Sequence, residues 1–150
     1  MFSVIINIIL AALVLVPVIY FSINRKKTIS SEFNDFLQSI KNQSGKIDQQ
    51  MAFSESYLAL DVNGKTLYAK KSGEPLMTIP LKNGTTCTVL RNFESGNTTS
   101  ITSASLQIID SSLGKYTIPL FGHDSNVKFD ESEILDVVDW ESKIKSCIAK

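Results

Sequence analysis

The sequence carries no excess of charge of either sign. Its 150 residues include 15 Lys and Arg and 15 Asp and Glu, so the formal net charge is zero. Proteins that bind nucleic acid usually carry a clear basic excess, because they neutralise phosphates. We therefore expect no nucleic-acid partner. With 43% apolar and 20% charged residues, the composition is that of a chain that folds.

Cysteine and histidine are scarce. The two cysteines, Cys87 and Cys147, are too few for a disulfide scaffold and lack the spacing of a metal site, which the single histidine could not complete. His123 and Asp124 are neighbours in a predicted loop, which does not supply the geometry of a Ser–His–Asp or Cys–His site. We predict no catalytic residue, no metal and no cofactor, and we interpret both cysteines as small core residues.

The chain begins with a long apolar run. Between residues 2 and 23 the clearly polar side chains are Ser3, Asn7 and Ser22. A helix of this length reaches about 33 Å, enough for a hydrocarbon core of ~30 Å. A cleaved signal peptide is the alternative, but it would place basic residues before a shorter apolar core, and no Lys or Arg precedes this run. We predict an uncleaved transmembrane helix at 2–23.

Arg25, Lys26 and Lys27 follow the apolar run directly and form the predicted membrane flank. The positive-inside rule then places the rest of the chain in the cytoplasm, which makes this a single-pass membrane protein in contact with the lipid bilayer. The alternative is an inverted chain with an extracytoplasmic domain, in which Cys87 and Cys147 could form a disulfide.

Residues 24–48 are predicted to be a juxtamembrane linker with a short amphipathic helix over Thr28–Ser44. Its apolar residues recur at helical spacing: Ile29, Phe33, Phe36, Leu37 and Ile40. The opposite face is not rich in lysine, which favours packing on the following domain, or a spacer stalk, over a position on the bilayer surface.

From about residue 49 the apolar period changes to two, which is typical of strands. Asn63-Gly64 and Asn83-Gly84 are strong turn signals, because both residue types tolerate positive φ. Glu94–Ser103 is polar and predicts a long hairpin tip, and Pro119 indicates an edge strand. The predicted strands begin near Met51 and continue at 57–62, 65–71, 76–81, 85–92, 104–110 and 115–121.

The helical period returns near the end of the chain. Asp130 and Glu133 have the spacing of a capping box, with Asp130 as the N-cap. The acidic residues of these first turns suit the helix dipole, and they lack the alternation and central glycine of a calcium loop. One apolar stripe follows, made of Ile134, Val137, Trp140, Ile144, Cys147 and Ile148.

These elements together predict an α+β fold. After the transmembrane and short amphipathic helices, residues 49–150 form a small antiparallel β-barrel or sandwich of about six or seven strands. The C-terminal helix closes it by burying its apolar stripe.

The stretch from Tyr57 to Ile148 resembles bacterial pleckstrin-homology-like (PH-like) domains. The resemblance is carried by the hairpin YLALDVNGKTLYAKK, by MTIPLKNGTTCTVLRN and SLQIIDSSLGKYTIPLF, and by the final helix EILDVVDWESKIKSCI with its tryptophan. It implies the β-barrel domain with a C-terminal helix, and a binding or scaffolding module rather than an enzyme.

Members of this family that hold phosphoinositides place several basic residues around the first hairpin. Here that region offers Lys65, Lys70 and Lys71, and Asp61 offsets them. We interpret these lysines as a solvated edge, and contact with a lipid headgroup is the alternative. The main prediction is a membrane-anchored interaction module for an unknown protein partner, whose peptide adds to a free strand edge or lies between sheet and helix.

Overall fold

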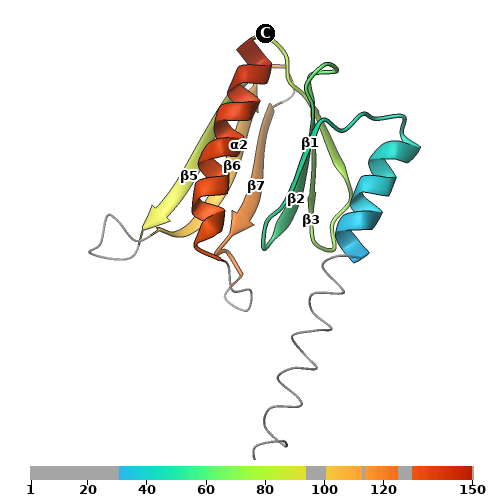
Figure 1. Cartoon of the computed structure of the whole chain (residues 1–150). Helices are drawn as coiled ribbons and strands as arrows, with labels where there is room; N and C mark the ends of the chain where they lie inside the picture. Colours follow the sequence, from blue (N-terminus) through green and yellow to red (C-terminus); the bar gives the residue numbers. More distant parts are fainter. Residues whose placement is uncertain (1–30, 94–100, 113, 125–129, 150) are drawn as a thin grey trace, which may run out of the picture. The chain divides into compact units, whose positions relative to one another are not determined.

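The computed structural model describes residues 31–93, 101–112, 114–124 and 130–149 (Figure 1). The chain divides into two compact units, Met1–Asp35 and Phe36–Lys150, and all the described strands belong to the second. Within the described residues no helix is long and apolar enough to cross a membrane. The predicted transmembrane helix at 2–23 and its flank, Arg25, Lys26 and Lys27, lie outside these residues and stay predictions.

The fold is α+β, as the change of apolar period predicts. A helix covers residues 31–42, and seven described strands and a C-terminal helix follow. One antiparallel sheet has the order β1 (Gln49–Ala52), β2 (Ser56–Asp61), β3 (Thr66–Lys71) and β4 (Met77–Pro80). The other is also antiparallel, with the order β5 (Thr86–Phe93), β6 (Ile101–Asp110) and β7 (Gly114–Phe121). The last element is α2 (Ser132–Ala149).

The two sheets stay separate, so the barrel alternative is wrong for the described strands. The consecutive strands β4 and β5 do not pair. Strand β4 ends at Pro80, and the next N–H, that of Leu81, still donates to the Lys65 carbonyl beside β3 (2.7 Å). The chain then turns through Gly84, whose φ is +95°. Thr85 fixes this corner: its N–H donates to the Lys82 carbonyl (3.0 Å), and its hydroxyl accepts from the Lys82 N–H (3.1 Å).

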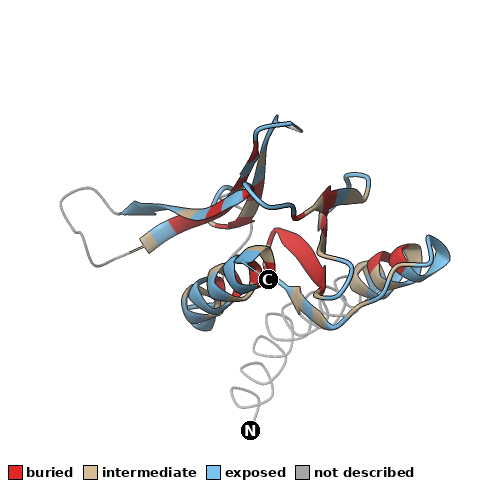
Figure 2. Ribbon diagram, turned by 90° about the horizontal axis from the view of Figure 1, so that it is seen from above, coloured by how far each residue is buried: buried red, intermediate tan, exposed pale blue. Residues whose placement is uncertain are grey.

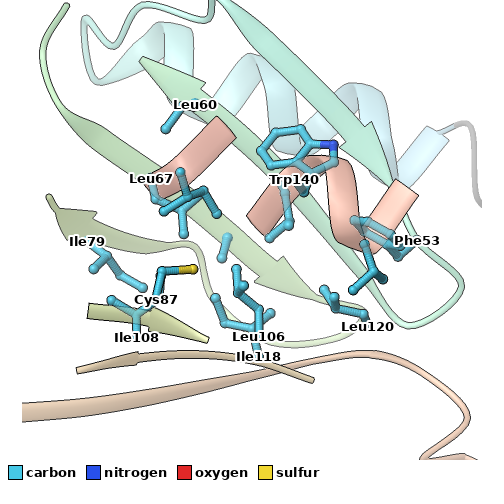
Figure 3. Close-up of a cluster of buried hydrophobic side chains, with 14 of the residues drawn as sticks. Phe53, Leu60, Leu67, Ile79, Cys87, Leu106, Ile108, Ile118, Leu120 and Trp140 are labelled. Carbon is cyan, nitrogen blue, oxygen red and sulfur yellow. The ribbon is translucent and has the colours of Figure 1, made fainter. Parts of the chain in front are cut away.

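Both sheets and α2 contribute side chains to one hydrophobic core (Figure 3). Leu60 and Leu67 come from the first sheet, and Leu106 and Ile118 from the second. Trp140 of α2 lies among them and is only 1% exposed. The predicted stripe on α2 is confirmed, since the buried residues of this helix are Val137, Trp140, Ile144 and Cys147. The helix therefore closes the core, as predicted.

Strand β2 is buried on both faces, although its sequence alternates as if one face were exposed. Leu58 and Leu60 face the main core, whereas Tyr57 lies on the opposite face. There its ring packs against the ring of Phe36, with the two centroids 5.9 Å apart. Phe36 and Ile40 are both fully buried. Residues 36–42 therefore pack against the domain rather than serving as an isolated stalk.

Two element boundaries differ from the predicted ones. Strand β6 begins at Ile101, inside the stretch expected to be a hairpin tip, because Ile101 still pairs with Phe93 across an irregularity at Asn92 and Phe93. Helix α2 begins at Ser132, two residues after the predicted cap Asp130. The capping box itself is present: Asp130 accepts from the Ser132 N–H (3.0 Å), and Glu133 accepts from the Asp130 N–H (3.1 Å).

Candidate interaction site at the β5 edge

The three lysines proposed as headgroup contacts are not gathered at one place. Lys65 lies in the turn before β3, whereas Lys70 and Lys71 lie at the far end of that strand. A strand of this length separates its ends by about 20 Å. Lys71 also forms an ion pair with Glu74 (3.2 Å). The geometry therefore gives these lysines no shared anion site.

His123 contacts groups that sequence reasoning did not connect with it. Its Nε2 lies 2.8 Å from the hydroxyl of Ser105, which is buried, and 3.2 Å from the carbonyl oxygen of Ala104. Nε2 donates to these oxygens if it carries the ring proton and accepts from the Ser105 hydroxyl if it does not. With either tautomer, the pair fastens the loop to the sheet.

Glu55 holds the same loop from the other sheet. Its Oε1 accepts hydrogen bonds from the backbone N–H groups of His123 (2.6 Å) and Asp124 (2.7 Å). The adjacent Gly122 has φ +76°, and a Cβ there would lie 2.0 Å from the Thr102 carbonyl oxygen. The chain after β7 therefore lies tightly against its neighbours, and only glycine fits at this point.

The turn between β1 and β2 also holds the start of α2. The Glu133 carboxylate accepts from the Ser54 N–H (2.9 Å) and from the Ser54 hydroxyl. Ser54 and Glu55 thus connect one turn with both the loop after β7 and the first turn of α2. A capping-box spacing predicts that Glu133 bonds backward to Asp130, but nothing in the sequence indicates its second partner.

Both cysteines are buried free thiols, in agreement with their interpretation as core residues. Burial, with a smaller contribution from the Glu141 carboxylate, raises the pKa of Cys87 to about 12. The Cys147 thiol lies 3.6 Å from the Val62 carbonyl oxygen, to which it donates. No group of His, Cys, Asp and Glu in the described part of the chain could hold a metal ion.

The outer strands of the sheets differ in how open their free edges are. Strands β1 and β4 have four residues each, and β4 ends at Pro80. Strand β7 contains Pro119, as predicted for an edge, and the N–H of Glu55 donates to its Leu120 carbonyl (3.0 Å). Short strands, prolines and covering segments are the usual means by which proteins block strand edges. Strand β5 has eight residues, no proline and, within the described residues, no strand beyond it.

Exposed apolar side chains accompany this free edge. Leu90 and Phe93 of β5 are 44% and 47% exposed, and Leu135 and Val138 of α2 are 75% and 48% exposed. Figure 1 shows β5 and α2 side by side. Figure 2 shows α2, which ends at the point marked C, with exposed residues along the side that faces away from the strands. Leu90 lies on the face of the sheet away from α2, because it alternates with Arg91, which pairs with Glu141 of the helix. We use the name β5–α2 surface for the free edge of β5 together with these exposed residues of the two elements.

An ion pair links the two elements of the β5–α2 surface. Arg91 lies 3.8 Å from Glu141, which also pairs with Lys145 at 2.7 Å. Glu141 interrupts the apolar stripe of α2, and this pairing explains how it is accommodated there. Arg91 is the single charged residue of β5 and already has a partner. The edge therefore offers backbone hydrogen bonds and apolar contacts rather than an unpaired charge.

Comparisons of the chain with protein-family models, with curated proteins and with solved structures found no significant match.

Proposed function

We propose that this chain is a membrane-anchored, PH-like interaction module that takes an extended peptide of a protein partner as an added strand on β5. The observation that carries the proposal is the free edge of β5, which is long, lacks proline and has exposed Leu90 and Phe93. An extended peptide can pair with such an edge through its main chain and can insert alternate side chains into neighbouring contacts.

The PH-like assignment draws support from the order of the elements. Seven described antiparallel strands precede one C-terminal helix, and that helix packs Trp140 into the core. This order of strands and helix is the one that the sequence resemblance implies, although the two described sheets do not close into the β-barrel that it also implies. The membrane anchor and the cytoplasmic orientation are supported by the apolar run at 2–23 and by Arg25, Lys26 and Lys27.

The β5–α2 surface favours one kind of peptide. Arg91 and Glu141 neutralise each other, and the other exposed side chains of β5 are uncharged: the apolar Leu90 and Phe93 stand beside Thr86, Thr88 and Asn92. Side chains of an added strand alternate between the two faces of the sheet. The preferred peptide therefore has apolar residues at every second position and no charge at those positions.

The experiment presents the full chain, in lipid nanodiscs, to a library of random peptides. Enriched peptides should show alternating apolar residues, and the strongest binder should slow amide hydrogen exchange within residues 86–93. Leu90→Lys should weaken that binding at least tenfold. Ile109→Lys is the matched control, because Ile109 is 42% exposed on the central strand β6 and cannot touch a strand added to β5.

Three results would count against the proposal. The first is a library selection that enriches no peptide, and the second is protection that falls outside residues 86–93. The third is equal weakening by Leu90→Lys and Ile109→Lys, because a central-strand residue should not matter to edge pairing. The headgroup alternative would instead be favoured if the unchanged chain and the Leu90→Lys variant both bound anionic vesicles and if this binding slowed amide hydrogen exchange at Lys65 and Lys71.

A further inference from the structure

Two Asn-Gly pairs lie in exposed turns, at Asn63-Gly64 between β2 and β3 and at Asn83-Gly84 between β4 and β5. Asn-Gly is the dipeptide most open to spontaneous deamidation, because glycine has no Cβ to obstruct its own nitrogen. That nitrogen attacks the side-chain carbonyl carbon of the asparagine. Sequence alone treats both pairs as equal hairpin signals, but their surroundings differ.

The nitrogen of Gly64 is held away from this reaction. Its N–H donates to Asp61 Oδ1 at 2.6 Å, and the Asp61 side chain is buried. The attack requires the nitrogen to lose its proton, and a carboxylate that accepts this proton in a hydrogen bond disfavours the resulting anion. On the other side of the residue, the Thr66 hydroxyl donates to the Gly64 carbonyl (3.0 Å). The two peptide groups that flank the Gly64 Cα are therefore each held by a side chain.

Gly84 has neither restraint. Within the described residues its N–H has no hydrogen-bond acceptor, and no atom lies within 4 Å of the position that a Cβ would take. Asn83 and Gly84 are both exposed, so water reaches the reacting atoms. We infer that Asn83 is the site at which this chain deamidates, and that Asp61 protects Asn63.

The reaction balances without a cofactor. The Gly84 nitrogen forms a bond to the Asn83 side-chain carbon, the bond from that carbon to the amide nitrogen breaks, and the nitrogen leaves as ammonia with the Gly84 proton. The product is a five-membered succinimide. Water then adds to one of its two carbonyls and opens the ring, which gives aspartate, or isoaspartate with the main chain rerouted through the side chain.

The product alters the corner that leads into β5. Isoaspartate inserts one extra carbon into the main chain between Lys82 and Thr85, whose two mutual hydrogen bonds close this turn. The Thr85 hydroxyl also donates to Asp110 Oδ2 (2.9 Å), a buried contact to the end of β6. A lengthened main chain cannot keep both sets of bonds. Deamidation at Asn83 should therefore loosen the first residues of β5.

The test incubates the folded full chain at mildly alkaline pH and follows isoaspartate and aspartate at both sites by peptide mapping. We expect product at Asn83 to form several-fold faster than at Asn63. In concentrated urea the two rates should converge, because the hydrogen bond from Gly64 to Asp61 is lost. Asp61→Ala should accelerate Asn63 alone, whereas Asp61→Asn should stay slow, since its side-chain oxygen still accepts from the Gly64 N–H.

The inference is overturned if Asn63 deamidates as fast as Asn83 in the folded chain. It is also overturned if the ratio of the two deamidation rates is the same in urea as in the folded chain. The second result would place the difference in the flanking sequence rather than in the fold. If the Asp61→Ala variant does not fold, the comparison of the folded and the urea-treated wild-type chain still decides the question.

Discussion

Replacing Glu55 tests how the fold fixes the chain between β7 and α2. The side chain is only 6% exposed, and a single carboxylate oxygen accepts from two backbone N–H groups, those of His123 (2.6 Å) and Asp124 (2.7 Å). A hydrogen bond to a charged group contributes about 1.5–3 kcal/mol. His123 and Asp124 are exposed, so water replaces part of what is lost. We therefore expect Glu55→Ala to lower the free energy of unfolding by about 3 kcal/mol.

The conservative variant separates charge from shape. Glu55→Gln keeps an oxygen that accepts both N–H groups but removes the charge, so it should cost about 1 kcal/mol. Glu74→Ala is the control, because Glu74 forms an exposed ion pair with Lys71 and should contribute less than about 1 kcal/mol. Urea unfolding of the full chain in nanodiscs can be followed by the fluorescence of Trp140, the sole tryptophan.

Amide exchange gives a second, local measurement. The amides of His123 and Asp124 should exchange on the order of 100-fold faster in Glu55→Ala, the factor that about 3 kcal/mol represents. If Glu55→Ala unfolds within about 0.5 kcal/mol of the unchanged chain, or if those two amides exchange at the same rate, the carboxylate does not hold this loop.

Three further predictions concern the core and one tight turn. Since burial raises the pKa of Cys87 to about 12 from an ordinary 9.0, the folded state disfavours the thiolate. The contribution of the Cys87 thiol to the free energy of unfolding should be fully present below pH 9 and should be lost as the pH rises toward 12. The thiol of the folded chain should also resist alkylation until the chain unfolds. Trp140→Phe should cost about 1–2 kcal/mol and Trp140→Ala about 3–5 kcal/mol, measured by circular dichroism in urea. The indole N–H has no hydrogen-bond partner within the described residues, so the loss is packing and the contact of the ring with the Lys143 ammonium, 5.8 Å from its centroid. Gly122→Ala should cost about 1–3 kcal/mol more than Gly73→Ala. Both glycines have φ +76°, but only at Gly122 would a Cβ meet the main chain of another segment. Thermal unfolding of the two variants compares them directly.

Local signals in the sequence predict much of this fold, because they depend on residues that are close along the chain. The Asn-Gly pairs mark the turn between β2 and β3 and the turn between β4 and β5. The spacing of apolar residues along α2 predicts the side of the helix that buries Trp140. The capping box at Asp130 and Glu133 is found for the same reason. Separation of the sheets is a tertiary property: Pro80 weakens the end of β4, but only the bonds of Thr85 to Lys82 and Asp110 direct the chain into a second sheet.

The contacts around His123 could not be predicted, because they join residues far apart in sequence. Ser105 is one of many serines, and Glu55 reads as an ordinary polar turn residue. The burial of the second face of β2 could not be predicted for the same reason. Tyr57 alternates with Leu58 as an exposed residue would, and it is the packing of Phe36, far away in the sequence, that buries Tyr57. Sequence patterns identify which residues share a face of an element, but not which other element covers that face.

The candidate site depends on a comparison of edges that sequence permits only in part. Pro119 marks β7 as an edge by residue type alone, and Pro80 does the same for β4. Strand β5 has the opposite character, since it contains no proline that would mark it as an edge. Its position at the margin leaves backbone groups along its outer edge without a strand partner among the described residues. A strand edge of this length, without proline and with no covering strand in the described part of the chain, needs either a partner or a reason not to aggregate. Because Arg91 is already paired with Glu141, its charge offers little repulsion to an approaching strand, and a partner is the better explanation.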